Sequence, residues 1–168
     1  MAESTIIRTK RDGQWLIADS GAAHTYTVAY EPGDGQYTVP DYAVNLFLDR
    51  GIIGSTPSIR QGDEAPMTLG FSAYLRDLGD TANSYSTLLD IAHRYAGRYV
   101  ESNWTSTLGT NSDVFTVTIN LTLDGSFCGE ADKTISFPFC VVRANVKEGD
   151  PNTVDVSATS YAVRPTLS

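Results

Sequence analysis

Residues 113–125 read DVFTVTINLTLDG, and this stretch alternates more regularly than any other in the chain. One face of the extended stretch receives five apolar residues: Phe115, Val117, Ile119, Leu121 and Leu123. The other face receives mostly hydroxyl and amide side chains: Val114, Thr116, Thr118, Asn120 and Thr122. A period of two is typical of a half-buried β-strand, and Asp124-Gly125 is a common hairpin turn. The stretch therefore predicts one strand of an antiparallel sheet.

The same alternation recurs in five further stretches: Thr25–Tyr30, Tyr42–Asp49, Met67–Leu75, Thr134–Ala144 and Thr153–Val163. Weaker strands are expected at Ile6–Arg8 and around Trp15–Ala18. Within the fourth stretch, the alternation predicts one shared face for four residues: Ile135, Phe137, Phe139 and Val141. The non-core faces are rich in Thr, Ser and Asn, which suits either solvent or another subunit.

One segment has the period of a helix instead. In NSYSTLLDIAHRYAG, apolar residues follow a helical stripe: Tyr85, Leu88, Leu89, Ala92 and Tyr95. The 168 residues are thus expected to form one domain, 1–168, of the mainly β class. Its expected architecture is an antiparallel β-sandwich or barrel with one flanking α-helix and a long inter-strand loop.

Composition excludes several functions. The net charge of −8 argues against tight binding to duplex DNA, where affinity comes from cations that neutralise phosphates. The sequence has no apolar run near the ~20 residues of a membrane helix, and its first residues do not resemble a signal peptide. We therefore expect a protein made in the cytoplasm, with no membrane partner and with Cys128 and Cys140 as free thiols.

The sequence has few features of a catalytic or metal-binding site. His93 lies three residues after Asp90 on the expected helix, a spacing that a catalytic dyad could use but that is usually a surface contact. No nucleophile motif, metal-ligand cluster or phosphate-binding loop accompanies the pair. We expect no catalytic, cofactor-binding or metal-binding residues, no cofactor and no enzymatic activity.

The connection from Asp49 to Pro66 is the most informative feature. Its length of about 18 residues exceeds the ~12–15 that structureless loops in compact domains usually reach. It also carries three isoleucines among its charges, at positions 52, 53 and 59. Apolar residues on a loop that extends from the domain are expected to be buried against another surface, and a neighbouring subunit would provide that surface.

Three segments follow one another in the chain: FLDRGIIG…SIRQGDEAPMTLGFSAYL, which contains the long connection, then the expected helix, and then VFTVTINLTLDG. In the order of these segments, the chain resembles the tail tube (major tail) proteins of long-tailed bacteriophages. The resemblance runs from about Tyr42 to the C-terminus. It implies hexameric rings whose inner strands join into one β-barrel, stacked as a hollow tube that conducts genome DNA without specific binding. The noncontractile, flexible tail is the default expectation. An acidic lumen, which would repel phosphate, would explain the negative charge.

The resemblance also implies partners and contacts. The protein would be assembled in the host cytoplasm, reside in the virion tail, and meet a tape-measure protein and tail-tip and terminator proteins. The long loop would reach the adjacent ring through seven residues: Arg50, Ile52, Ile53, Ile59, Arg60, Asp63 and Glu64. Its four charged members are candidates for ion pairs between rings.

Two other readings remain open. A tail-terminator or distal-tail protein of related fold would form single rings. A monomeric β-barrel binding module could hold an apolar ligand in a cavity lined by four aromatic residues: Tyr26, Tyr30, Trp104 and Phe137.

Overall fold

The computed structural model describes residues 13–22, 25–28, 35–40, 44–48, 57–63, 65–74, 104–109, 114–126, 129–162 and 164–168. In two of its strands, β4 and β5, it describes the backbone and the side chain of Asn45. The strands are β1 Gly13–Ala18, β2 Thr25–Thr27, β3 Gln36–Thr38, β4 Val44–Leu48, β5 Pro57–Gln61, β6 Met67–Tyr74, β7 Val117–Leu123, β8 Lys133–Lys147, β9 Thr153–Ser160 and β10 Thr166–Leu167. A short 3-10 turn, Ser20–Ala22, follows β1.

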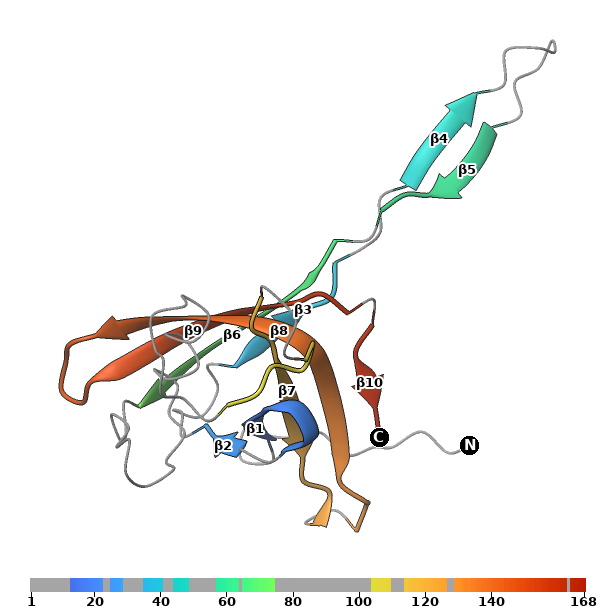
Figure 1. The fold of residues 1–168 in the computed structure, drawn as a ribbon. Helices are drawn as coiled ribbons and strands as arrows, with labels where there is room; N and C mark the ends of the chain where they lie inside the picture. Colours follow the sequence, from blue (N-terminus) through green and yellow to red (C-terminus); the bar gives the residue numbers. More distant parts are fainter. Residues whose placement is uncertain are drawn as a thin grey trace.

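Eight of these strands form one antiparallel sheet, which we call the body (Figure 1). Their order is β2-β1-β7-β8-β9-β6-β3, and β10 also pairs with β8. The expectation of a mainly β, antiparallel fold is confirmed. The expected helix and the strand at Ile6–Arg8 lie outside the described residues.

The long strand β8 divides the body into two layers. At Cys140 it pairs with Val117 of β7 on one edge and with Ser160 of β9 on the other. Before Cys140 its neighbours are β7 and β10, and after Cys140 its neighbour is β9. One layer therefore contains β3, β6, β9 and the C-terminal part of β8, and the second contains β2, β1, β7, β10 and the N-terminal part of β8.

A bulge bends β8 between the two layers. Val117 pairs with Cys140 and Ile119 with Phe137, so two residues of β8, Pro138 and Phe139, oppose one residue of β7. Phe139 has a φ of 54°, which a bulky residue rarely adopts. The extra residue also reverses the alternation. Phe139 is exposed and Cys140 is buried, so the predicted shared face from Ile135 to Val141 is wrong beyond Phe137.

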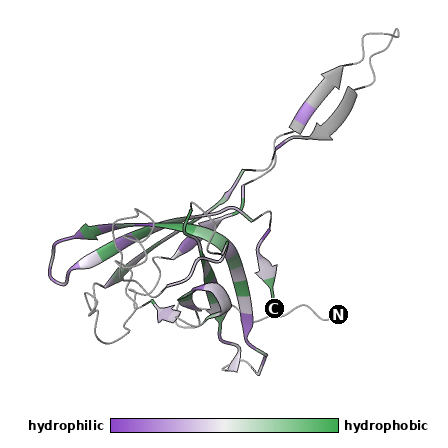
Figure 2. Cartoon of the chain, viewed as in Figure 1, coloured by the Kyte–Doolittle hydropathy of each residue, from purple (hydrophilic) through white to green (hydrophobic). Residues whose placement is uncertain are grey.

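The core lies between the layers. Trp15 of β1 stacks on Phe71 of β6 at 5.6 Å and on Phe137 of β8 at 6.4 Å between ring centroids. Buried apolar residues of β6 and β9 belong to the same core cluster: Met67, Leu69, Phe71, Ala73, Val154, Val156 and Ala158. Figure 2 shows hydrophobic residues along the strands of the body and hydrophilic ones at the β8–β9 turn. Trp104 and Phe137, which the binding-module reading placed around a ligand, are packed inside this core.

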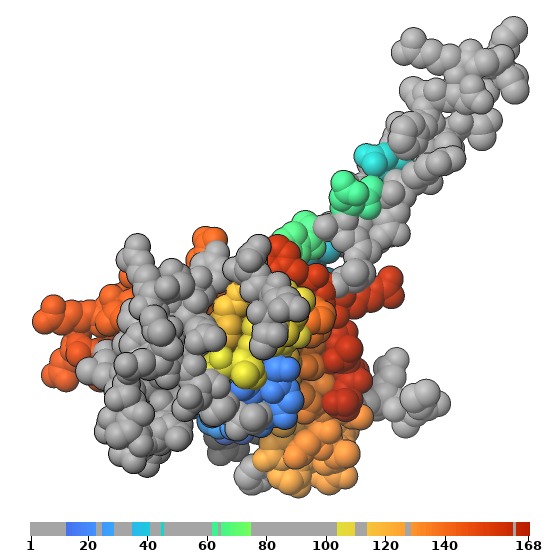
Figure 3. Space-filling view, in the orientation of Figure 1, coloured from blue at the N-terminus to red at the C-terminus, as the bar shows by residue number. Residues whose placement is uncertain are grey.

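The remaining two strands, β4 and β5, form a separate antiparallel hairpin, which we call the arm. Figure 1 shows the arm projecting away from the body. The expected long loop is thus interrupted, because β5 occupies Pro57–Gln61 and returns along β4. Figure 3 shows the turns after β7 and β8 as separate protrusions of the body.

A pair of prolines explains why the arm separates from the body. Thr38 pairs with Thr68, and two further rungs of that register would set Pro40 opposite Pro66. Proline has no N–H to donate, so neither residue can continue the ladder. The arm resumes with Val44 opposite Gln61, one residue out of the β3–β6 register. The strands entering and leaving the arm therefore change their relative alignment at its base.

Candidate assembly surfaces

The outer face of the first layer is polar and rich in hydroxyl groups. Pairing between β3, β6, β9 and β8 places these residues on it: Gln36, Thr38, Thr68, Gly70, Ser72, Tyr74, Thr153, Asp155, Ser157, Thr159, Val141, Arg143, Asn145 and Lys147. The opposite face holds the residues of the hydrophobic core, so one side of the sheet is apolar and the other is mostly polar. Val141 is the apolar exception on the polar side and is only 6% exposed. The threonine-rich face expected from the sequence is therefore this surface.

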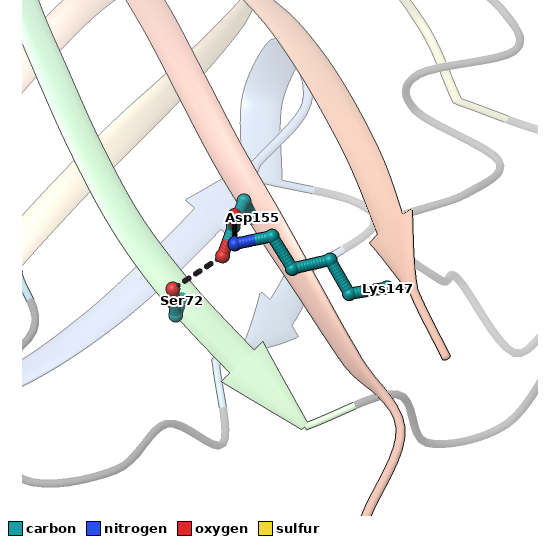
Figure 4. A network of polar contacts seen from close by, with 3 residues as sticks. All are labelled: Ser72, Lys147 and Asp155. Atoms are coloured by element: carbon teal, nitrogen blue, oxygen red, sulfur yellow. Dashed lines mark hydrogen bonds and ion pairs between the residues drawn. The ribbon is translucent and has the colours of Figure 1, made fainter. Parts of the chain in front are cut away.

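Charges on this face are few and partly compensated. Figure 4 shows Asp155 between Ser72, whose hydroxyl donates to Oδ1 at 2.6 Å, and Lys147, whose ammonium forms an ion pair with Oδ2. These hydrogen bonds, first from Lys147 and then from Ser72, hold the pKa of the Asp155 carboxyl below its ordinary value. Arg143 is a further, exposed cation. The strand residues of this face thus carry two cations and one carboxylate.

Most of the acidic residues that the structure describes lie at two turns. Three occupy the β7–β8 turn, Asp124, Glu130 and Asp132, and two occupy the β8–β9 turn, Glu148 and Asp150. A face lined with carboxylates, expected from the net charge, is not what the described strands of the first layer show. The carboxylates that the structure describes therefore gather at the ends of these two hairpins.

The first layer has two lateral edges. One is the outer edge of β3, and the other is the edge of β8 from Val141 to Lys147 that faces away from β9. Among the residues that the structure describes, no strand pairs with either edge. Unpaired strand edges present N–H and C=O groups that can hydrogen-bond a strand of another chain.

The arm is amphipathic by position. Its register sets Val44, Leu46 and Leu48 of β4 opposite Gln61, Ile59 and Pro57 of β5. Residues opposite each other share a face of an antiparallel pair, so Val44, Leu46, Leu48 and Ile59 lie on one face, while Phe47 lies on the other face, opposite Ser58. Asn45 and Arg60 are opposite each other on the second face, and the Asn45 side chain is exposed. A two-stranded hairpin alone is marginally stable in water, so this apolar face needs a cover.

The predicted contact residues are only partly brought together. Ile59 and Arg60 are consecutive residues of β5 and therefore belong to opposite faces of the arm. Asp63 is exposed just after β5. Four others, Arg50, Ile52, Ile53 and Glu64, lie outside the described residues. The apolar positions of β4 alternate visibly in the sequence, but they were not predicted to belong to this surface, because residues 57–61 were expected to form a loop and not a partner strand.

Two ionisable groups inside the body have structural surroundings. Asp19 is buried and accepts hydrogen bonds from the Thr105 backbone N–H at 3.2 Å and hydroxyl at 2.9 Å. Burial raises the pKa of Cys140 to about 12, which leaves its thiol protonated at neutral pH. Within the described ranges, no group of three or more His, Cys, Asp or Glu could hold a metal ion, and no helix is long and apolar enough to cross a membrane.

We compared this chain with known proteins, first by sequence and then by fold. No protein-family model matches the chain, and no curated protein matches it in sequence. A chain of the 6-fold symmetrised anti-feeding prophage (AFP) baseplate aligns with 100% of this chain and 97% of its own length, with a TM-score of 0.53 and 8% identity.

Two further matches come from the ends of tubes. One is in the sheath/tube terminator of the PVC extracellular contractile injection system, covering 100% of this chain and 98% of its own at a TM-score of 0.52 and 8% identity. Another is in the AFP tube terminating cap, covering 100% and 94% at a TM-score of 0.51 and 10% identity. The chain therefore has a fold found in phage-tail-like contractile injection particles.

Proposed function

We propose that this protein is a structural subunit of a phage-tail-like tube, in which hexameric rings stack around a hollow channel. The observation that carries the proposal is the first layer, a four-stranded sheet with two lateral edges, a buried apolar face and a polar outer face. Pairing the β3 edge of one copy with the β8 edge of the next would satisfy both edges and close a ring.

The geometry of such a ring is consistent with a channel. Six copies would contribute roughly 24 strands to one continuous barrel, too many for side chains to fill its interior. At about 4.8 Å between neighbouring strands, the backbone circle would be at least roughly 37 Å across. The polar faces would line this channel, and the apolar faces would remain covered by the second layer.

The polar face that would line the channel suits a polymer that passes through without binding tightly. Its surface is mostly hydroxyl groups and amides, and its carboxylate already has a cation partner. Phosphate-binding proteins gain affinity by gathering cations, whereas the strand residues of this face carry one net positive charge per copy, because Asp155 pairs with Lys147. Genome DNA is the cargo that we propose, with a tape-measure protein and tail-tip and terminator proteins as further partners in the virion tail.

A terminator is the second candidate. Two of the matched structures are described as a sheath/tube terminator and a tube terminating cap. A terminator needs the lateral edges to form a ring, but it ends a tube and does not repeat along it. The expectation of a noncontractile tail stays a prediction, and so does the absence of enzymatic activity.

Electron microscopy of the purified protein over a concentration series, with light scattering beside it, separates the candidates. Stacked rings or tubes of uniform width support the tube subunit. Single rings at every concentration support the terminator. A strict monomer, even after addition of a preassembled tail tip, would refute both and favour the monomeric binding module.

A further inference from the structure

The second layer leaves apolar residues uncovered at β10. Leu167 pairs with Ile135 of β8, and opposite residues share a face. Ile135 packs against the core, on the same side of β8 as the fully buried Phe137. Leu167 therefore faces the core side of the layer, yet 72% of it is exposed. Tyr37 lies 5.1 Å from the Phe137 ring between centroids and is 40% exposed.

The exposed Leu167 belongs to a strand with one unpaired edge among the described residues. β10 pairs with β8 on one side, and the reciprocal backbone hydrogen bonds between Thr134 and Ser168, at 2.9 and 3.0 Å, extend that ladder by one rung. Among the described residues, no strand lies on the other side of β10. A strand added there would extend the second layer, and its apolar positions could continue the row that now ends at Leu167.

The same chain has a segment with the complementary properties. The arm is a two-stranded ribbon with free outer edges among the described strands, and its register gathers Val44, Leu46, Leu48 and Ile59 on one face. Figure 1 shows the arm projecting away from the body, and within the described residues its two strands pair only with each other. The occupant that fits is therefore a second copy of the chain.

We propose that the arm of one copy adds to the β10 edge of another copy, with its apolar face over Leu167 and Ile135. The contact joins two different surfaces of identical chains, so it is head-to-tail and can repeat without limit. It is also distinct from the lateral β3 and β8 edges. Since it connects copies within or between rings, it rests on the proposed assembly into a tube.

Cross-linking between mixed chains tests the contact. Arm cysteines are placed singly at Val44, Leu46 and Leu48, and the acceptor cysteine is Leu167→Cys, all with Cys128→Ser. Disulfides form only where Cα atoms come within about 7 Å, so a mixed-chain disulfide under mild oxidation supports the contact. Leu108→Cys is the matched control, because Leu108 is also exposed, at 50%, but lies outside the arm, β10 and the two lateral edges.

A second variant tests assembly. Leu167→Asp should fold normally, because the side chain is mostly exposed, and it should raise the concentration at which tubes appear at least tenfold. Leu108→Asp is the paired control for charge, because this exposed leucine lies outside the arm, β10 and the lateral edges. If the wild-type protein forms tubes but no arm cysteine cross-links to Leu167→Cys, or all of them cross-link preferentially to Leu108→Cys, the arm contact is overturned and the tube proposal is left standing. A wild-type protein that never assembles overturns both.

Discussion

Replacing Gly35 by alanine tests how tightly the two layers are packed. A Cβ at this position would lie 2.3 Å from Nε1 and 2.9 Å from Cε2 of Trp15. The indole has little room to retreat, because it is 2% exposed and stacked on Phe71 and Phe137. Forcing extra atoms into a packed core costs about 1–3 kcal/mol. At about 2–4 °C per kcal/mol for a chain of this size, a 2 kcal/mol loss lowers the melting temperature by roughly 4–8 °C.

Gly70→Ala is the matched control. A Cβ there would have its nearest neighbours at 3.8 Å, the Gln36 Nε2 and the Val156 carbonyl oxygen, which is ordinary contact. Alanine in a strand is favoured over glycine by about 0.5–1 kcal/mol, so this variant should be neutral or more stable. Urea unfolding followed by tryptophan fluorescence measures both. A Gly35→Ala protein as stable as wild type, or equal losses in the two variants, would refute the packing argument.

Four further perturbations have defined outcomes. The pKa of Asp155 is lowered in the folded state, so its interactions stabilise the fold above the ordinary carboxyl pKa of about 4 and are lost as the pH falls below it. Asp155→Asn should therefore reduce the loss of stability at acid pH when the free energy of unfolding is measured against pH. In a Cys128→Ser background, Cys140 should react with a thiol reagent at pH 8 only after denaturant unfolds the chain; rapid labelling of the native protein would contradict its burial. Phe139→Gly should be more stable than Phe139→Val by about 1–2 kcal/mol in urea unfolding, because a β-branched residue tolerates the φ of 54° poorly. Arg60→Glu should leave the circular dichroism spectrum unchanged but prevent stacking in micrographs, and long tubes of this variant would argue against an ion pair through the arm.

The strands of the body could be predicted from alternating apolar and polar residues, because most of them have one buried face and one polar face. β6 and β9 bury the alternating residues that were expected, Leu69 and Val156 among them. The weak stretch at Trp15–Ala18 became a central strand, because its partners β2 and β7 supply the pairing that local pattern could not reveal. The alternation failed after Phe137, where one extra residue in β8 reverses the faces.

The arm shows a different limit. Residues 57–61 read PSIRQ, which begins with proline and lacks a clear apolar alternation. Its strand state depends on pairing with β4, a nonlocal contact that no window of sequence contains. The paired positions of Pro40 and Pro66 likewise became meaningful only once the register between β3 and β6 was known. The contact residues proposed from the loop were therefore split between two faces.

The unequal lengths of the ladders beside the arm determine how the protein would carry tension. A pull on the arm reaches the body through β3 and β6. The β3 ladder spans only Gln36–Thr38, whereas β6 is paired with β9 along its whole length, Met67–Tyr74. Force along β6 would load the longer β6–β9 ladder in shear and pass from β9 to β8. Because β8 belongs to both layers, its backbone would carry the force into the second layer. Mechanical failure should therefore begin with the peeling of β3, while the strand shared by both layers remains in place.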